Sequence, residues 1–178
     1  MSGHSKWAQI KHKKTATDSK RSKLFSQLSR AITLATREKG NNPGLNASLR
    51  TAIEKAQAVN MPKDTIDRAI KKAIIDEGLV HVRYEAYGPG GVAIVIEGIT
   101  DNNNRTVSEI KKILETHDAK LAPGGAVWAF IKQSDVWVPS TYIPVDVSCQ
   151  EKIEMLKNDL EEHDDVQGIY TNMTPRDQ

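Results

Sequence analysis

The chain has 178 residues, of which 38% are apolar, and a formal net charge of +2 at pH 7. That is enough to build one medium hydrophobic core or two small ones. No apolar run approaches the roughly 18 residues that a membrane span needs, and the start is too polar for a secretory signal, so we expect a cytoplasmic protein with no membrane partner. Cys149 is the only cysteine, which excludes an internal disulfide and a cysteine-rich metal site.

The charges are divided unevenly along the chain. Residues 1–74 hold 16 Lys and Arg against 5 Asp and Glu, a net charge of +11, whereas residues 75–178 hold 9 against 18, a net charge of −9. A modest excess of one sign serves solubility on many domains, but +11 over 74 residues favours a polyanionic partner. We therefore predict a basic nucleic-acid-binding domain over residues 1–76 and an acidic domain over residues 79–178.

The basic part is predicted to start with a polar arm of about 16 residues, which is followed by three amphipathic helices. The first helix begins after the candidate caps Thr17 and Asp18 and ends at Gly40. Its apolar side is made of Leu24, Phe25, Leu28, Ala31, Ile32 and Ala35. A basic stripe of Lys23, Arg30 and Arg37 lies on the opposite side, because these residues are spaced by seven.

The other two helices follow a turn-rich NNPG segment at residues 41–44. Asn46 is the expected N-cap of the second helix, and Pro62 opens the third from a first-turn position. Their apolar sides are Leu49, Ala52, Ile53 and Ala56 in the second, and Ile66, Ala69, Ile70 and Ala73 in the third. The three helices predict a compact helical domain.

From about residue 79 the apolar period changes from 3.6 towards 2, which predicts a second domain of mixed structure. Alternating Val80, Val82 and Tyr84 predict a strand, GPGG at 88–91 a turn, and residues 92–99 a buried strand. The capping boxes TVSE at 106–109 and SCQE at 148–151 each predict a helix. Strands are further expected at 126–131, 136–145 and 166–170. From residue 92 the order is β-α-β-β-α-β, so the predicted fold class is α+β: a three-helix domain followed by a ferredoxin-like split βαβ domain with an extra N-terminal strand.

The sequence contains no phosphate-binding P-loop, nucleophile elbow, zinc-protease helix or C-x-x-C pair. We therefore expect no enzyme, no cofactor and no small-molecule substrate. His4 and His12 are spaced too far apart for a helical zinc pair, which leaves phosphate contact or solvation. GPGG could bind an anion but fits a hairpin turn better, and residues 101–105 could hold a phosphate but fit a helix cap better. The acidic residues 161–165 are interpreted as a solvated helix end rather than as catalytic carboxylates.

The opening segment carries the sharper prediction. It places seven cations in the 18 residues from Lys6 to Lys23, with Asp18 as the single acid. Phosphate contacts of this density release counterions, so affinity should fall steeply with salt. Trp7 either stacks on a base or packs on its own helical domain, and a membrane anchor is disfavoured because the segment has few bulky apolar residues. The predicted nucleic-acid-binding residues are Lys6, Trp7, Lys11, His12, Lys13, Lys14, Lys20, Arg21, Lys23 and Arg30.

The same segments carry a family resemblance. GHSKWAQIKHKK with SKRSKLF, then YEAYGPGGVAIVIEGITDNNNRTVSEIKKIL, PGGAVWAF and DDVQGIY, in this order, resemble the YebC family over nearly the whole chain. The resemblance implies a helical N-terminal domain followed by two α+β domains. It also implies a role as a DNA-binding transcriptional regulator or as a ribosome-associated translation factor that relieves stalling; the family includes a mitochondrial translational activator. The contacts that it implies map onto Lys6, Trp7, Lys11, Lys13, Lys14, Lys20 and Arg21.

One departure from the family is large. Longer members carry a further domain after the strand that is AVWAFI here, whereas only about residues 132–135 bridge that gap in this chain, so it resembles a short member without the third domain. The preferred function is a translation factor that binds rRNA, the ribosome or another structured RNA by shape and backbone. The alternative is a transcriptional regulator bound to duplex DNA, which requires base readout; only Arg50 and Gln57 share a suitable helix face. A further hypothesis is that the acidic domain masks the basic one when nothing is bound.

Overall fold

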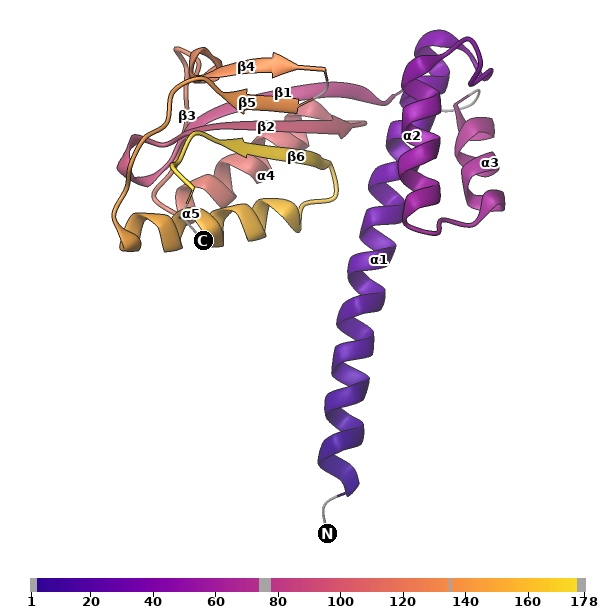
Figure 1. Cartoon of the computed structure of the whole chain (residues 1–178), viewed down its shortest axis with the longest axis horizontal. Coiled ribbons are helices and arrows are strands. Elements are labelled where there is room, and N and C mark those ends of the chain that lie inside the picture. The colour runs from indigo at the N-terminus through magenta and orange to yellow at the C-terminus, as the bar shows by residue number, and fades with distance from the viewer. Residues whose placement is uncertain (1–2, 74–77, 135, 176–178) are drawn as a thin grey trace. The chain divides into compact units, whose positions relative to one another are not determined.

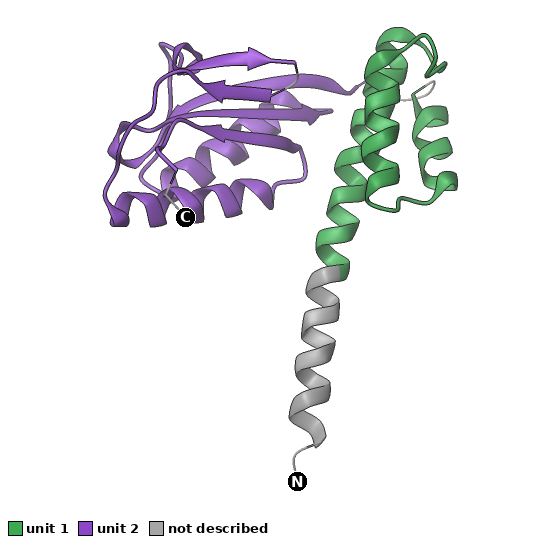
Figure 2. Cartoon of the chain, in the orientation of Figure 1, with its two compact units in different colours: residues 1–77 green, residues 78–178 purple. Residues whose placement is uncertain are grey.

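The structure is a computed structural model that describes residues 3–73, 78–134 and 136–175, with only the backbone described for residues 3–17. The chain divides into two compact units, Met1–Glu77 and Gly78–Gln178 (Figure 2).

The first unit consists of α1 (Gly3–Lys39), α2 (Ala47–Ala58) and α3 (Lys63–Lys72). The predicted arm was wrong, because α1 already begins at Gly3. The physical reason is that residues 4–39 contain neither glycine nor proline, so nothing interrupts the helix before Gly40. The predicted end is confirmed: Gly40 has a φ of 86°, the left-handed conformation that closes many helices, and its N–H donates to the Thr36 carbonyl at 2.8 Å.

The core of the first unit forms where α1 contacts both α2 and α3 (Figure 1). Its buried members come from all three helices and from the loop between α2 and α3: Ile32, Ala35, Leu49, Ala52, Ala56, Met61, Ile66 and Ala69. The predicted apolar sides are therefore confirmed, except that Leu24 is 38% exposed. A buried Thr33 hydroxyl donates to the Ala69 carbonyl at 2.9 Å and so ties α1 to α3.

Asn46 fixes the connection between α1 and α2. Its carboxamide oxygen accepts the Leu49 N–H at 3.0 Å, which confirms it as the N-cap of α2. Its Nδ2 donates to the carbonyls of Ala35 at 2.7 Å and Gly40 at 2.8 Å, and the side chain is fully buried. One asparagine thus joins the end of one helix to the start of the next.

The second unit contains a four-stranded antiparallel sheet with the order β3-β1-β2-β6. Its strands are β1 (Val80–Tyr87), β2 (Ala93–Thr100), β3 (Lys120–Leu121) and β6 (Val166–Thr171). The 3₁₀ turn η1 (Pro89–Gly91) joins β1 to β2, which confirms the hairpin reading of GPGG. A second turn, η2 (Val127–Ala129), leads into a separate two-stranded sheet of β4 (Phe130–Gln133) and β5 (Val136–Pro139).

Helices α4 (Asn103–Thr116) and α5 (Val147–Glu161) cover one face of the main sheet, and the β4–β5 hairpin lies on the other face (Figure 1). Alternate residues of β2 point into the two layers. Ile94 and Ile96 pack against the helices, whereas Ala93 and Val95 pack against η2 and the hairpin. Burial of both faces explains why residues 92–96 are continuously apolar rather than alternating.

The α+β class is confirmed, as is the order of a helical part followed by a part with sheet and helices. The strand pairing differs from the ferredoxin-like expectation, because β4 and β5 form their own two-stranded sheet instead of joining the main one. Residues 127–129 of the strand predicted at 126–131 form the turn η2 instead. The short strand β3, which was not predicted, pairs with β1 at the sheet edge. The two predicted helices begin earlier than their capping boxes, because Asn102 and Asp146 supply the caps.

Candidate nucleic-acid interface

All ten predicted binding residues lie on α1. The side chains of the first six, Lys6, Trp7, Lys11, His12, Lys13 and Lys14, fall outside the described residues. Their role therefore stays a prediction. The prediction itself changes in one respect, because these six residues belong to the helix α1 rather than to an irregular arm.

The other four predicted residues are described. Lys20 and Arg21 are exposed, whereas Lys23 and Arg30 are half-buried. The Arg21 guanidinium lies over the Phe25 ring, 5.2 Å from its centroid, a cation–π contact that gives this long side chain a fixed platform. This part of α1 therefore presents cations from a continuous helix.

The helical unit carries further exposed cations that sequence reasoning did not assign to binding. Four of the ten residues of α3 are basic, a density that is visible in the sequence itself. Arg68 is held in place, because its Nε donates to the Asp64 carbonyl and its Nη2 to Thr65 Oγ1, both at 3.2 Å. In the described helices of the first unit, the exposed Lys and Arg outside the predicted set are Arg37, Lys39, Arg50, Lys55, Lys63, Arg68, Lys71 and Lys72.

Arg50 bears on the question of base readout. Its guanidinium donates to the Pro43 carbonyl at 3.0 Å, in the loop between α1 and α2. A guanidinium that is engaged with its own loop is not aligned with a base edge in the way that bidentate readout requires. Arg50 is therefore held within its own unit.

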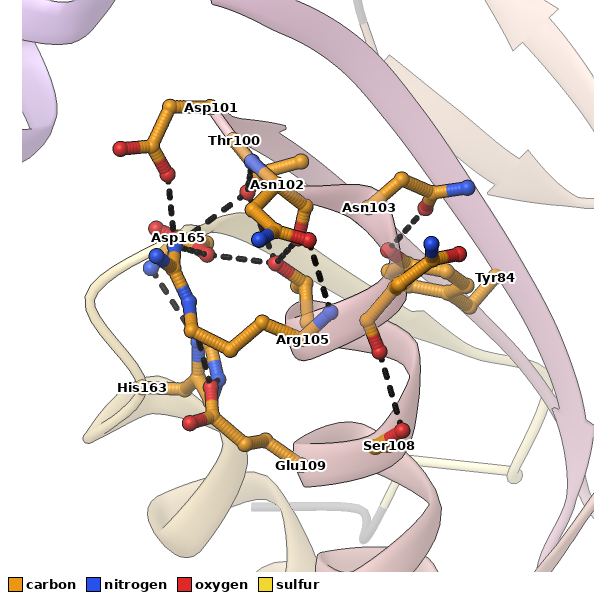
Figure 3. Close-up of polar contacts among 12 residues, drawn as sticks. Tyr84, Thr100, Asp101, Asn102, Asn103, Arg105, Ser108, Glu109, His163 and Asp165 are labelled. Atoms are coloured by element: carbon orange, nitrogen blue, oxygen red, sulfur yellow. Dashed lines mark hydrogen bonds and ion pairs between the residues drawn. The ribbon is translucent and has the colours of Figure 1, made fainter.

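The polar loop of the second unit, which we considered as a phosphate site, is a helix cap (Figure 3). Asn102 accepts the Arg105 N–H at 3.0 Å, which confirms the cap reading. The Arg105 guanidinium donates to Asp101 at 2.8 Å and to Asp165 at 2.9 Å. These hydrogen bonds, first to Asp165 and then to Asp101, raise the pKa of Arg105 above its ordinary value. The cation of this loop is therefore already neutralised inside the domain.

Asp165 is the centre of that cluster and corrects the expectation of a solvated acidic end. Glu161, Glu162 and Asp164 are exposed, but Asp165 is only 1% exposed. Its carboxylate accepts the Thr106 hydroxyl at 2.6 Å in addition to Arg105. A carboxylate that is saturated by internal donors serves structure rather than acid–base chemistry.

His163 joins the same cluster to α4. The Asp165 N–H donates to His163 Nδ1 at 3.1 Å, so Nδ1 is the acceptor and Nε2 carries the proton that points at Glu109, 2.9 Å away. His117 pairs with Asp159 at 2.7 Å and likewise links α4 to α5. Both histidines thus hold the helix layer together.

The described part of the chain contains no group of three or more His, Cys, Asp or Glu side chains placed to hold a metal ion. None of its helices is both long and apolar enough to cross a membrane.

Comparisons with known protein families match both units. Residues 5–75 match the TACO1/YebC protein N-terminal domain, and residues 79–136 and 129–173 match the TACO1/YebC second and third domain. The two matches to the second model meet at β4 and β5, where the sequence suggested that a domain is missing.

Similar curated proteins are named probable transcriptional regulatory proteins. The one from Petrotoga mobilis is 45% identical over 176 residues, which cover 96% of this chain and 70% of the relative. The one from Dictyoglomus thermophilum is 38% identical over 237 residues, which cover 97% of this chain and 95% of the relative. Because that alignment is longer than this chain, the relative carries internal residues that the chain lacks.

A similar solved structure supports the fold. The crystal structure of a conserved hypothetical protein, Aq1575 from Aquifex aeolicus, matches with a TM-score of 0.82 and 31% identity. The match covers 90% of this chain and 93% of that one.

Proposed function

Because the chain belongs to the TACO1/YebC family, we propose that it is a non-enzymatic, nucleic-acid-binding regulator of gene expression that acts in the cytoplasm. The observation that carries the proposal is the surface of the helical unit. Its described helices display exposed Lys and Arg on a rigid scaffold, within a segment whose net charge is +11. Relatives named as transcriptional regulators support the same class of function.

Within that class we place the chain as a translation factor that binds the ribosome or another structured RNA. Structured RNA is recognised mainly by its shape, phosphates and 2′-hydroxyls. The described cations suit such recognition, because Arg21 rests on Phe25 and Arg50 is engaged with its own loop instead of being extended towards base edges. Binding would neutralise phosphates and release counterions, which makes affinity depend strongly on salt.

The second candidate is a regulator that binds duplex DNA. The names of the relatives favour it. It requires a set of side chains that reads base edges in a groove, and the described face of α2 offers Gln57 as an exposed candidate.

The experiment is sedimentation of the purified protein with ribosomes across a salt series, with duplex DNA as the competitor. For the translation factor we expect co-sedimentation that is lost at high salt and resists DNA competition. Displacement by small amounts of one DNA sequence would favour the transcriptional alternative instead.

Matched variants test whether the helical unit makes the contacts. The exposed pair K20Q/R21Q on α1 removes two charges, and the exposed pair K111Q/K112Q on α4 removes the same charge from the second unit. We expect K20Q/R21Q to lower affinity about tenfold and the control pair to have little effect. Equal losses from both pairs would contradict the assignment to α1.

A further inference from the structure

We propose that α3 shares the binding of the nucleic-acid backbone with α1, through a row of four cations on one side of their contact. This α1–α3 basic row consists of Arg30 and Arg37 on α1 with Arg68 and Lys72 on α3. The inference rests on the proposed function and adds to it a second helix, which sequence reasoning did not assign to binding.

The hydrogen bond between Thr33 and the Ala69 carbonyl places the row. At 2.9 Å it fixes one point of α1 against one point of α3, and both residues are buried. On α1, Arg30 and Arg37 lie three residues before and four residues after Thr33, so they share its side of the helix. The contact thus brings two arginines to the edge of α3.

The same spacing operates on α3. Lys72 lies three residues after Ala69 and shares its side of the helix, and Arg68, which directly precedes Ala69, lies next to Lys72 because the two are four residues apart. Because α3 runs in the same direction as α1 (Figure 1), the two pairs of cations run alongside each other. Arg37, Arg68 and Lys72 are exposed, and Arg30 is half-buried.

The dimensions suit a phosphodiester strand. Arg30 and Arg37 are seven residues apart, which is about 10 Å along a helix. One strand of a duplex carries a charge about every 3.4 Å along its axis, so the row spans about three phosphates. Arg68 is also restrained by its bonds to Asp64 and Thr65, which lowers the entropy lost when it binds.

The other two cations of α3 provide a matched control. Lys63 and Lys71 are exposed like Arg68 and Lys72, but they lie six residues before and two residues after Ala69. Lys63 lies nine residues before Lys72, on the opposite side of the helix, and Lys71 lies three residues after Arg68, at the margin of the row. The pairs R68Q/K72Q and K63Q/K71Q therefore remove equal charge from different parts of the surface of one helix.

The experiment measures binding of the full chain to a short RNA duplex and to ribosomes between about 50 and 200 mM salt. We expect R68Q/K72Q to reduce the slope of log affinity against log salt by about 1.5, and K63Q/K71Q to leave it close to that of the unmodified chain. Circular dichroism checks that both variants keep their helices.

The outcomes separate this inference from the proposed function. Equal effects of the two pairs, or no effect of R68Q/K72Q while the unmodified chain binds, would overturn the row and leave the proposed function standing. If the unmodified chain binds no ribosome, RNA or DNA at low salt, the proposed function and the row fall together.

Discussion

Replacement of Asn46 by alanine should destabilise the helical unit. The substitution removes the N-cap acceptor of α2, which costs about 1 kcal/mol. It also takes the donor away from the carbonyls of Ala35 and Gly40, at about 1 kcal/mol each for bonds inside the fold. The expected loss is therefore about 3 kcal/mol in the free energy of unfolding of this unit.

Hydrogen exchange of the α2 amides is the appropriate assay, because it reports on this unit alone. A loss of about 3 kcal/mol corresponds to exchange that is faster by about two orders of magnitude. Asn42 provides the control: it is exposed and accepts one N–H, from Gly44 at 2.9 Å, so Asn42→Ala should cost less than about 0.5 kcal/mol. If Asn46→Ala accelerates exchange no more than Asn42→Ala does, the hydrogen bonds of Asn46 do not stabilise the connection between α1 and α2, and the reasoning is refuted.

Three further predictions concern the second unit. Asp165→Asn removes the buried partner of Arg105. Because the Arg105 side chain is itself 42% exposed, we expect the free energy of unfolding of this unit to fall by only about 2 kcal/mol. Hydrogen exchange of the β2 amides should become faster, and unchanged exchange would contradict the prediction. Burial alone would raise the pKa of Glu85, but the N–H groups of Ala126 and Val127 and the Arg83 guanidinium outweigh that effect. The pKa of Glu85 is therefore held below its ordinary value of 4.5. The ionised carboxylate therefore stabilises the unit above pH 4.5, and this effect is lost as the pH falls through the lowered pKa. Glu85→Gln should flatten the acid limb of the curve of stability against pH. A variant curve that runs parallel to that of the unmodified chain would count against this. Gly90→Ala and Gly91→Ala each place a side chain at positive φ, which costs about 1 kcal/mol. At Gly90 the new Cβ would also lie 2.8 Å from the Val145 side chain, whereas at Gly91 it would meet no atom within 4 Å. Gly90→Ala should therefore lower the denaturation midpoint further, and equal midpoints would disprove the clash.

Local chemistry predicted the helical unit well, because its signals are short-range. Gly40 ends a helix and Asn46 starts one through interactions within a few residues, and both are where the sequence placed them. The start of α1 was missed for the opposite reason: polar residues without an apolar stripe resemble an arm, although nothing in them breaks a helix.

Strand pairing was less predictable, since it depends on contacts far apart in the chain. The two residues of β3 are too few to show alternation, and they are recognisable only by their pairing with β1. The β4–β5 hairpin has the local pattern of two adjacent strands, but that pattern does not say which sheet the strands join.

The candidate interface on α1 stays a prediction, which rests on charge density in the sequence. The proposed row on α3 depends in addition on one hydrogen bond, from Thr33 to the Ala69 carbonyl, between residues 36 positions apart. No periodicity within either helix contains that information. A buried acid such as Asp165 was missed for a similar reason, because its partners Arg105 and Thr106 lie about 60 residues earlier.

The separate β4–β5 sheet makes this part of the chain a suitable place for the insertion of another domain. Neighbouring antiparallel strands bring their ends to within about 5 Å of each other, so a foreign module joined between Gln133 and Val136 would enter and leave at adjacent positions. Because neither strand pairs with the main sheet, a reporter or affinity domain could be inserted there with the order β3-β1-β2-β6 intact. The same geometry would let an evolving gene gain or lose a whole module in one step.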